Sequence, residues 1–253
     1  MTWKSVALVA LFTVLLSSTA LAGDDTAQSK PIPVVVELFT SEGCSSCPPA
    51  DQLLGELRKI AVRDNAELIL LGEHVDYWNQ LGWNDRFSSS EFSDRQSRYS
   101  VRFHLASVYT PQMVIDGRSE IVGNDGPGVL KSIATAAQQP KSAKVDVTWT
   151  PQGTLAIHVS RLDAVAAHVM MAITEDDLTT NVGRGENSGK VLRHTAVVRR
   201  LVALGKTSAE GFSDSVTVSL DRKWASDKLR VAVWVENKTG ILGAAATVSP
   251  PRD

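Results

Sequence analysis

The sequence predicts an α/β protein whose first half holds a parallel strand–helix–strand unit and whose second half is an antiparallel, sandwich-like β domain. Residues 34–39 and 68–75 are apolar runs typical of buried strands, and apolar positions between them recur at helical spacing. A strand, a helix and a second strand in this order form a parallel pair with a right-handed crossover. From residue 141 onward, short alternating runs are separated by Pro, Gly, Asn and Asp. We therefore expect domains at residues 34–140 and 141–253.

The N-terminus is expected to be a cleaved export signal at residues 1–22, followed by a polar linker at residues 23–33. Lys4 precedes an apolar run at residues 5–16, and Ala-Leu-Ala at its end matches a small-x-small cleavage pattern. The run is shorter than the roughly 20 residues that span a bilayer, so a membrane anchor is the weaker alternative. We expect a periplasmic or secreted protein with no membrane span after signal removal.

The rest of the first half contains recognisable helix and hairpin signals. Ser90 is positioned to cap a helix that carries Phe92, Tyr99 and Phe103 on one stripe. The later elements are expected to be a strand at residues 108–115, a returning strand at 119–122 after an Asp-Gly hairpin turn, and a helix that ends by Pro140.

The second half is predicted to contain only strands. Residues 145–149 and 155–159 alternate between apolar and polar positions, which is typical of half-buried strands. Strands at this spacing favour an antiparallel β-sandwich. The later candidates are residues 167–173, 190–204, 215–220 and 229–235.

The composition indicates a soluble globular protein and gives no case for nucleic-acid binding. Hydrophobic residues make up 43% and charged residues 21% of the chain. The formal net charge is −2, whereas nucleic-acid binding usually needs a basic face. The chain has only two cysteines, Cys44 and Cys47, too few for a disulfide-stapled scaffold. Outside the cytoplasm such a pair can stay oxidised or be cycled.

Cys44 and Cys47, spaced Cys-Ser-Ser-Cys, are the strongest candidates for redox chemistry. A thiolate attacks disulfides, and the first turn of a helix stabilises a thiolate through its dipole and free N–H groups. Cys44 stands at the strand-to-helix junction, so we expect it to be the nucleophile and Cys47 to be the resolving thiol. Pro48 and Pro49 weaken the dipole argument, because a helix that starts at Pro48 leaves both cysteines in the preceding turn.

Two structural roles for the cysteine pair stay open as alternatives. A bracing disulfide would close a very short loop and stabilise the fold by about 2 kcal/mol. A zinc site usually needs four ligands, and the sequence offers no second cysteine pair.

Residues at the end of the second predicted strand are expected near the cysteines. The carboxyl ends of parallel strands open on one edge of a sheet, which places His74, Asp76 and Trp78 there. His74 is a candidate partner for the Cys44 thiolate, and with Cys44 and Cys47 it offers a soft site for Cu(I). The alternatives are that His74 is a hydrogen-bonded histidine at a strand end and that Asp76 is a capping or turn acid.

Further candidates surround the same edge. Glu37 is an acid in an apolar strand; burial would raise its pKa and let it accept the proton of Cys47, unless it points to an exposed edge. Glu42 is expected to be a solvated loop charge. Tyr77, Trp78 and Trp83 are candidates for the wall of a substrate groove, or alternatively for local core.

Two other features are expected to carry no chemistry. Residues 183–190 resemble a phosphate-binding loop, but the P-loop spacing fails and a hairpin turn is predicted. His158, His168 and His194 show no metal-ligand spacing with one another, so we expect them to be strand or loop residues.

The first half resembles the thioredoxin superfamily in its order of elements. A strand, the Cys-Ser-Ser-Cys loop, a helix, a strand and a helix precede Thr110-Pro111, which leads into an antiparallel pair and a last helix. The resemblance implies that Pro111 follows a cis peptide bond and lies against the cysteine pair. It also implies that Thr110 contributes to substrate contact and redox tuning. An edge-strand proline is the alternative, because only about 5–6% of X-Pro bonds are cis.

At a closer level, residues 37–51 are similar to the signature of an exported family of thioredoxin-like proteins that is classed as a domain of unknown function. Residues 74–78 and 109–112 carry the same resemblance, which extends over most of the mature chain. Two features differ from ordinary thioredoxins: Gly43 stands where a tryptophan precedes the first cysteine, and the second half is β-rich.

Three functional hypotheses result. The first is an exported thiol–disulfide oxidoreductase that needs no cofactor and uses Cys44 and Cys47 on the thiols or disulfides of exported proteins. The second is a copper-binding or copper-delivery protein with Cys44, Cys47 and His74 as ligands. The third is a non-catalytic module whose β-rich half binds a partner while the cysteines brace a loop.

Overall fold

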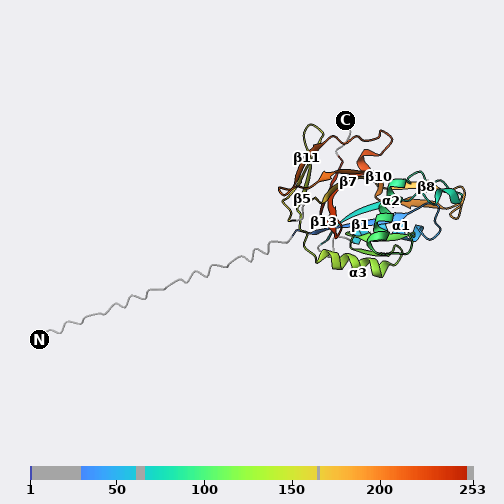
Figure 1. The fold of residues 1–253 in the computed structure, drawn as a ribbon, viewed down its shortest axis with the longest axis horizontal. Helices are drawn as coiled ribbons and strands as arrows, with labels where there is room; N and C mark the ends of the chain where they lie inside the picture. The colour runs from blue at the N-terminus through green and yellow to red at the C-terminus, as the bar shows by residue number, and fades with distance from the viewer. Residues whose placement is uncertain (2–29, 61–65, 164–165, 250–253) are drawn as a thin grey trace.

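A computed structural model gives the fold of residue 1 and residues 30–60, 66–163 and 166–249 (Figure 1). The expected signal, apart from Met1, and most of the expected linker lie outside these described residues. The described part of the chain is a mixed α/β structure with one large sheet and two smaller antiparallel sheets.

The first half contains the expected strand–helix–strand unit and hairpin. Its elements are β1 (Ile32–Thr40), α1 (Pro48–Ile60), β2 (Ala66–His74), a short 3-10 helix (Asn79–Leu81), α2 (Ser90–Arg102), β3 (Gln112–Ile115), β4 (Ser119–Val122) and α3 (Gly126–Ala137).

The second half consists of strands and one short 3-10 helix. Its elements are β5 (Val145–Trp149), β6 (Leu155–Val159), β7 (His168–Glu175), β8 (Leu178–Asn181), β9 (Val191–His194), β10 (Val197–Lys206), β11 (Phe212–Val216), the 3-10 helix (Ser226–Lys228), β12 (Leu229–Asn237) and β13 (Gly240–Val248).

The large sheet joins the two halves of the chain, so the expected division into two domains is not confirmed. Its order is β13-β12-β7-β10-β2-β1-β3-β4, with β1 and β2 parallel and β10 bridged to β2 through Val197 and Gly72. The long apolar run at residues 190–204, expected to be one strand, divides into β9 and β10. Because β10 pairs with both β2 and β7, four strands of the second half extend the sheet of the first.

Both faces of the large sheet are covered. On one face, Leu54 and Leu57 of α1 and Val129 of α3 form a buried core with β1 and β3. On the other face, Phe92 of α2 packs in a cluster that contains the fully buried Trp234 of β12. Burial of each such side chain stabilises the fold by about 1.5–3 kcal/mol.

A second layer over β7 and β12 retains part of the expected sandwich. The small sheet β11-β6-β5 packs its buried residues, among them Leu155 and Ile157, against Ile173 and Val233 of the large sheet. The antiparallel β-rich half is therefore a layer built on a shared sheet.

Local signals in the sequence set most element boundaries. The Asp116–Gly117 turn joins β3 to β4, and both residues have the positive φ angles, 51° and 61°, that this tight turn requires. The cap of α2 is Ser89, whose side chain accepts the Glu91 N–H, and the expected capping residue Ser90 is the first residue of the helix.

β13 was not expected, because its Gly- and Ala-rich sequence has low strand propensity. The structure explains the small residues by a close backbone approach. A Cβ atom added to Gly243 would lie 2.2 Å from the carbonyl oxygen of Ala143. No side chain fits at that distance without a backbone shift.

The Gly243→Ala variant is therefore expected to lose about 2–3 kcal/mol of unfolding free energy through overpacking. Gly126→Ala is the matched control, since a Cβ atom added at the start of α3 meets nothing within 4 Å. Urea unfolding of both variants measures the difference. Equal stability of the two variants would show that the Ala143 contact does not constrain β13.

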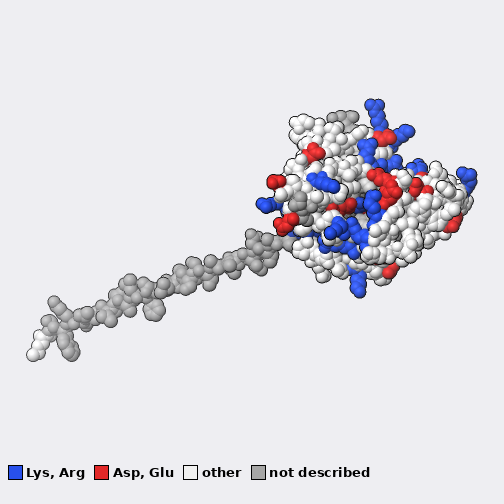
Figure 2. Space-filling model, in the orientation of Figure 1, with Lys and Arg blue, Asp and Glu red and all other residues white. Residues whose placement is uncertain are grey.

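The surface in view carries both signs of charge. Figure 2 shows Lys and Arg side by side with Asp and Glu over this face, in keeping with the formal net charge of −2. Within the described residues, no helix combines the length and the apolar character that crossing a membrane requires.

Candidate functional site

The cysteine pair lies in the turn between β1 and α1 and forms a disulfide with Cα atoms 5.4 Å apart. The Cys47 carbonyl accepts the N–H groups of Ala50 at 2.9 Å and Asp51 at 3.1 Å, so Cys47 immediately precedes the first helical turn. α1 begins at Pro48, as the two prolines indicated, and Cys44 lies a further turn out. The helix dipole therefore acts more directly on Cys47 than on Cys44.

The disulfide is covered in this conformation. Cys44 and Cys47 are both 0% exposed, whereas Ser45 and Ser46 between them are exposed. The Cys44 Sγ atom lies 3.3 Å from Ser46 Oγ. An incoming thiol cannot reach either sulfur atom until part of the cover moves.

Trp78 joins the cysteine loop to the segment before β3. A Cβ atom placed on Gly43 would lie 3.4 Å from Trp78 Cβ, and the Trp78 indole N–H donates to Thr110 Oγ1 at 2.8 Å. The Thr110–Pro111 peptide bond is cis, as the family resemblance implied. Trp78 and Thr110, each expected near the cysteine pair, thus contact one another.

Pro111 lies beside the first turn of α1. A Cβ atom on Gly123 would be 3.0 Å from Pro111 Cβ and 3.2 Å from Ala50 Cβ, so Pro111 and Ala50 flank Gly123 closely. Pro111 is thus near the helix that follows Cys47.

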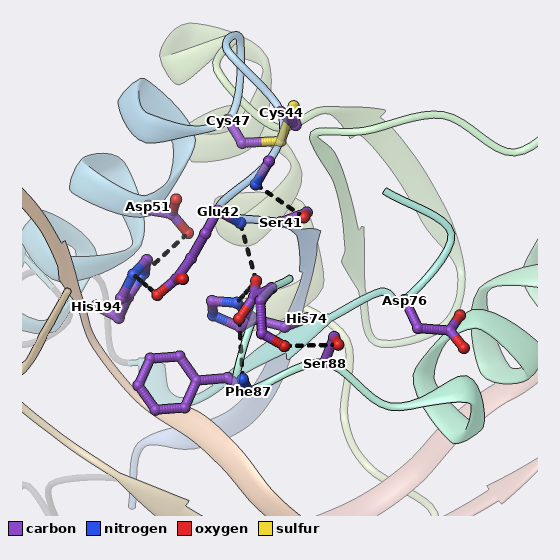
Figure 3. Close-up of polar contacts among 12 residues, drawn as sticks. Ser41, Glu42, Cys44, Cys47, Asp51, His74, Asp76, Phe87, Ser88 and His194 are labelled. Atoms are coloured by element: carbon purple, nitrogen blue, oxygen red, sulfur yellow. Dashed lines mark hydrogen bonds and ion pairs between the residues drawn. A yellow bond between two sulfur atoms is a disulfide. The ribbon is translucent and has the colours of Figure 1, made fainter. Parts of the chain in front are cut away.

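A buried polar cluster lies next to the disulfide on the α1 side of the sheet (Figure 3). The His194 ring stands between two carboxylates, with Nε2 3.3 Å from Glu42 Oε1 and Nδ1 4.0 Å from Asp51 Oδ1. His194 and Glu42 are 2% and 0% exposed, and neither ring nitrogen makes a well-aligned hydrogen bond. Glu42 was expected to be a solvated loop charge, but it is buried because Trp83 covers it and donates its indole N–H at 2.7 Å.

His74 belongs to the same cluster and is turned away from the cysteines. Its Nδ1 lies 2.6 Å from Asp85 Oδ2. Its ring packs edge-to-face on that of His194, with the ring centroids 4.8 Å apart. Asp85 Oδ2 also accepts the Glu42 backbone N–H. Across the described residues, no three His, Cys, Asp or Glu side chains are arranged to hold a metal ion. The geometry does not assemble the expected Cu(I) site of Cys44, Cys47 and His74.

The pKa values of the carboxyl groups in the cluster are shifted in different directions. Burial raises the pKa of Asp51 to about 7, even though His194 acts in the opposite direction. Burial also acts to raise the pKa of Glu42, but the close contact with His194 and the hydrogen bond from Trp83 outweigh it and leave the pKa below its usual value. The pKa of Asp85 is likewise lowered, because its contact with His74 and the hydrogen bonds from the backbone N–H groups of Glu42 and Phe87 together exceed the effect of burial.

Glu37 does not lie in this cluster. It is buried on the α2 face, where Tyr99 donates its hydroxyl to it at 2.5 Å and Arg95 forms an ion pair with it. Arg95 also binds Glu236 through both terminal nitrogens, at 2.8 and 3.0 Å. Alternation along β1 directs Glu37 to the face opposite α1, so its contacts are those of a structural ion-pair network.

The remaining candidates divide between the site and its surroundings. Asp76 lies apart from the disulfide in Figure 3, and its carboxylate accepts the Ser93 hydroxyl of α2. Tyr77 is 37% exposed and donates its hydroxyl to Gln96 at 3.1 Å. The expected proximity to the cysteine loop is thus found for Trp78, whereas His74 contacts Asp85, which accepts the Glu42 N–H, and Asp76 lies apart.

The hairpin of β8 and β9 covers the cysteine loop. Residues 183–190, which resembled a phosphate-binding loop, lie in the turn of this hairpin, as the sequence predicted. Asn187 is 0% exposed and donates its amide to the carbonyl oxygens of Glu42 at 2.8 Å and Cys44 at 2.9 Å. Glu186 accepts the backbone N–H of Ser45 at 3.0 Å.

Several residues of the site escaped the sequence analysis, among them Asp51, His194 and Asn187. Asp51 follows Cys47 by four positions, so helical spacing was a usable signal for it. His194 and Asn187 reach the site from the second half of the chain, and 143 positions separate Asn187 from Cys44. No local pattern predicts such a contact.

Fold and site together define a mixed α/β protein with a buried Cys-Ser-Ser-Cys disulfide at the end of a sheet strand and a buried His–carboxylate cluster beside it. The chain belongs to the family described as protein of unknown function (DUF1223), whose model matches residues 35–236. This match confirms the expected membership of a family of unknown function.

A solved structure is similar over most of the chain. The X-ray crystal structure of protein AGR_C_4864 from Agrobacterium tumefaciens matches with a TM-score of 0.71 and 27% sequence identity. The similarity covers 87% of this chain and 96% of that chain. No curated protein matches the chain.

Proposed function

We propose that this protein is an exported thiol–disulfide oxidoreductase with a thioredoxin-like first half, in which Cys44 and Cys47 are the reacting pair. The observation that carries the proposal is the disulfide between these cysteines at the strand-to-helix turn, next to Asp51 with its raised pKa. The order of elements and the approach of Trp78, Thr110 and Pro111 to the same turn support it.

The exchange begins from the oxidised pair. A thiolate of a substrate dithiol attacks Cys44 Sγ, the Cys44–Cys47 bond breaks, and Cys47 leaves as a thiolate that takes up one proton. The second substrate thiolate then attacks the substrate sulfur of the mixed disulfide and releases Cys44 as a thiolate. The substrate becomes a disulfide and the protein a dithiol. The reverse sequence reduces a substrate disulfide.

Asp51 takes the proton-transfer role that the sequence suggested for Glu37. It lies one helical turn after Cys47, and its carboxyl group is 8% exposed. It also lines a groove of about 590 Å³ between α1 and β9, which gives its proton a route to water. A carboxyl group with a pKa of about 7 can donate and accept a proton near neutral pH.

The trapping experiment tests this function. The Cys47→Ala variant is expected to accumulate mixed disulfides through Cys44 with exported proteins, because it lacks the thiol of Cys47 that resolves them. Cys44→Ser is the matched control and is expected to trap none. Non-reducing electrophoresis and mass spectrometry of the adducts give the readout. Failure to trap any partner, together with a pair that dithiols cannot cycle, would contradict the proposal.

Two further variants test the other two hypotheses. Full biological activity of a Cys44→Ser, Cys47→Ser double variant would favour the binding module. Copper delivery would be favoured if the reduced protein bound Cu(I) stoichiometrically and if His74→Ala abolished this binding while leaving redox cycling intact. We expect the double variant to be inactive and the His74 variant to keep its cycling.

A further inference from the structure

We propose that the loop at residues 182–190 is a latch over the disulfide, in which Asn187 positions the Cys44 turn and restricts access to it, and Glu186 destabilises the Cys44 thiolate. This inference rests on the proposed function, since it concerns the same cysteine pair. It assigns a role to the hairpin that reaches the site from the second half of the chain.

Asn187 holds the latch closed. Its two amide protons bind the carbonyl groups on either side of Gly43, those of Glu42 and Cys44. Lys190 donates to Asn187 Oδ1 at 2.9 Å and fixes the orientation of the amide. A fully buried side chain that satisfies two carbonyls of the reacting turn holds that turn in one conformation.

The loop at residues 182–190 can move while β8 and β9 stay in place, because its residues other than Val182 and Asn187 are exposed. β8 and β9 form a separate two-stranded sheet that shares no ladder with the large sheet. Gly185 and Gly189 have φ angles of 76° and 80°, a region that glycine adopts without strain. Trp83 packs against Gly183 and Gly185 and provides the surface on which the closed loop rests.

Glu186 acts on the charge that develops at Cys44. Backbone N–H groups of the cysteine turn are the natural donors to a Cys44 thiolate, and the Glu186 carboxylate already occupies that of Ser45. The negative charge of Glu186 also repels a thiolate at Cys44, the residue before Ser45. Both effects favour the protonated thiol of Cys44 and disfavour the reduced, thiolate-bearing pair.

Opening of the latch is the first event of exchange. The thiolate that attacks Cys44 must approach a sulfur atom that the closed state leaves 0% exposed. Release of the Asn187 amide frees the Cys44 turn, and withdrawal of Glu186 returns the Ser45 N–H to the sulfur. A substrate able to displace the loop therefore gains access to the disulfide, and the Cys44 thiolate that the exchange releases is better stabilised.

Reduction by dithiothreitol tests the role of Asn187 without a protein substrate. The Asn187→Ala variant is expected to be reduced about tenfold faster than the wild type, because two hydrogen bonds no longer hold the turn closed. Asn181→Ala is the matched control, an exposed asparagine of the same hairpin. Asn187→Ser serves as a second variant, and circular dichroism verifies the fold of each. Wild-type reduction rates in the folded Asn187 variants would overturn the latch.

Charge removal tests the role of Glu186. The Glu186→Gln variant keeps a hydrogen-bond acceptor for Ser45 but loses the charge, so the reduced protein should react with iodoacetamide about threefold faster below the thiol pKa. Glu210→Gln, an exposed acid of a distant turn, is the control. An unchanged or slower alkylation rate in Glu186→Gln would contradict the assignment.

The two proposals fail in different ways. If the Asn187 and Glu186 variants change these reagent rates but Cys47→Ala traps no protein, the latch stands and the oxidoreductase function falls. If trapping succeeds while the reagent rates stay at wild-type values, the function stands and the latch falls.

Discussion

The Arg95→Ala variant is expected to lose about 3–5 kcal/mol of unfolding free energy, because it leaves buried carboxylates without their counter-charge. Arg95 is 2% exposed and binds Glu37 and Glu236, and its Nε lies 3.7 Å from Glu73 Oε1. Burial acts to raise the pKa of Glu236, but the Arg95 charge outweighs it and lowers the pKa to about 2. Burial and the charge of Glu37 together raise the pKa of Glu73 well above its usual value.

The stability deficit of Arg95→Ala is expected to depend on pH. A carboxylate whose folded pKa is lowered stabilises the protein above its unfolded pKa, and that stability disappears as the pH falls through the folded value. The deficit of Arg95→Ala is therefore largest at neutral pH and shrinks as the pH falls from about 4.5 toward 2. Urea unfolding at several pH values measures it. Arg98→Ala, an exposed arginine of the same helix, is the control and should change stability by about 0.5 kcal/mol or less.

The Asp51→Asn variant is expected to abolish a loss of stability that the wild type shows between about pH 4 and pH 7. The folded pKa of Asp51 is raised from 3.8 to about 7, so folding favours the protonated form. The stability that this group contributes is present at low pH and is lost as the pH rises through the folded pKa. A shift of about three units corresponds to about 4 kcal/mol. Asparagine resembles the protonated acid and does not ionise.

The same variant should slow thiol exchange. Without an ionisable group beside Cys47, the leaving thiolate has no nearby proton donor, and the pH–rate profile should lose its inflection near pH 7. Asp94→Asn on α2 is the control, an exposed acid that should leave both profiles unchanged. Identical pH profiles of stability and exchange in Asp51→Asn and the wild type would remove Asp51 from the mechanism.

The sequence predicted individual elements more reliably than their assembly. The periodicity of residues 34–39 and 68–75 and the Asp116–Gly117 turn predicted the parallel strands β1 and β2 and the hairpin of β3 and β4. β13 was missed, because the close approach of Ala143 selects Gly243 and neighbouring alanines over residues with high strand propensity. The joining of both halves in one sheet depends on the pairing of β10 with β2, and such long-range pairing leaves no local pattern.

The candidate site shows the same limit. Cys44, Cys47 and Trp78 were predictable, because motif spacing and the strand–helix–strand order determine where they lie, whereas the place of Thr110 was implied by the family resemblance. Glu37 is buried, which is one of the two alternatives that the sequence left open, and the side-chain alternation of β1 directs it to Arg95 on the α2 face. His194 and Asn187 enter the site through the hairpin, so only the tertiary structure brings them to the cysteines.

The redox equilibrium of the Cys44–Cys47 pair with glutathione tests the central claim most directly. A thiol–disulfide oxidoreductase should exchange reversibly, with a reduction potential in the range of about −270 to −120 mV that such catalysts span. A potential below about −300 mV, the range of structural disulfides, in both the wild type and Asn187→Ala would contradict the account.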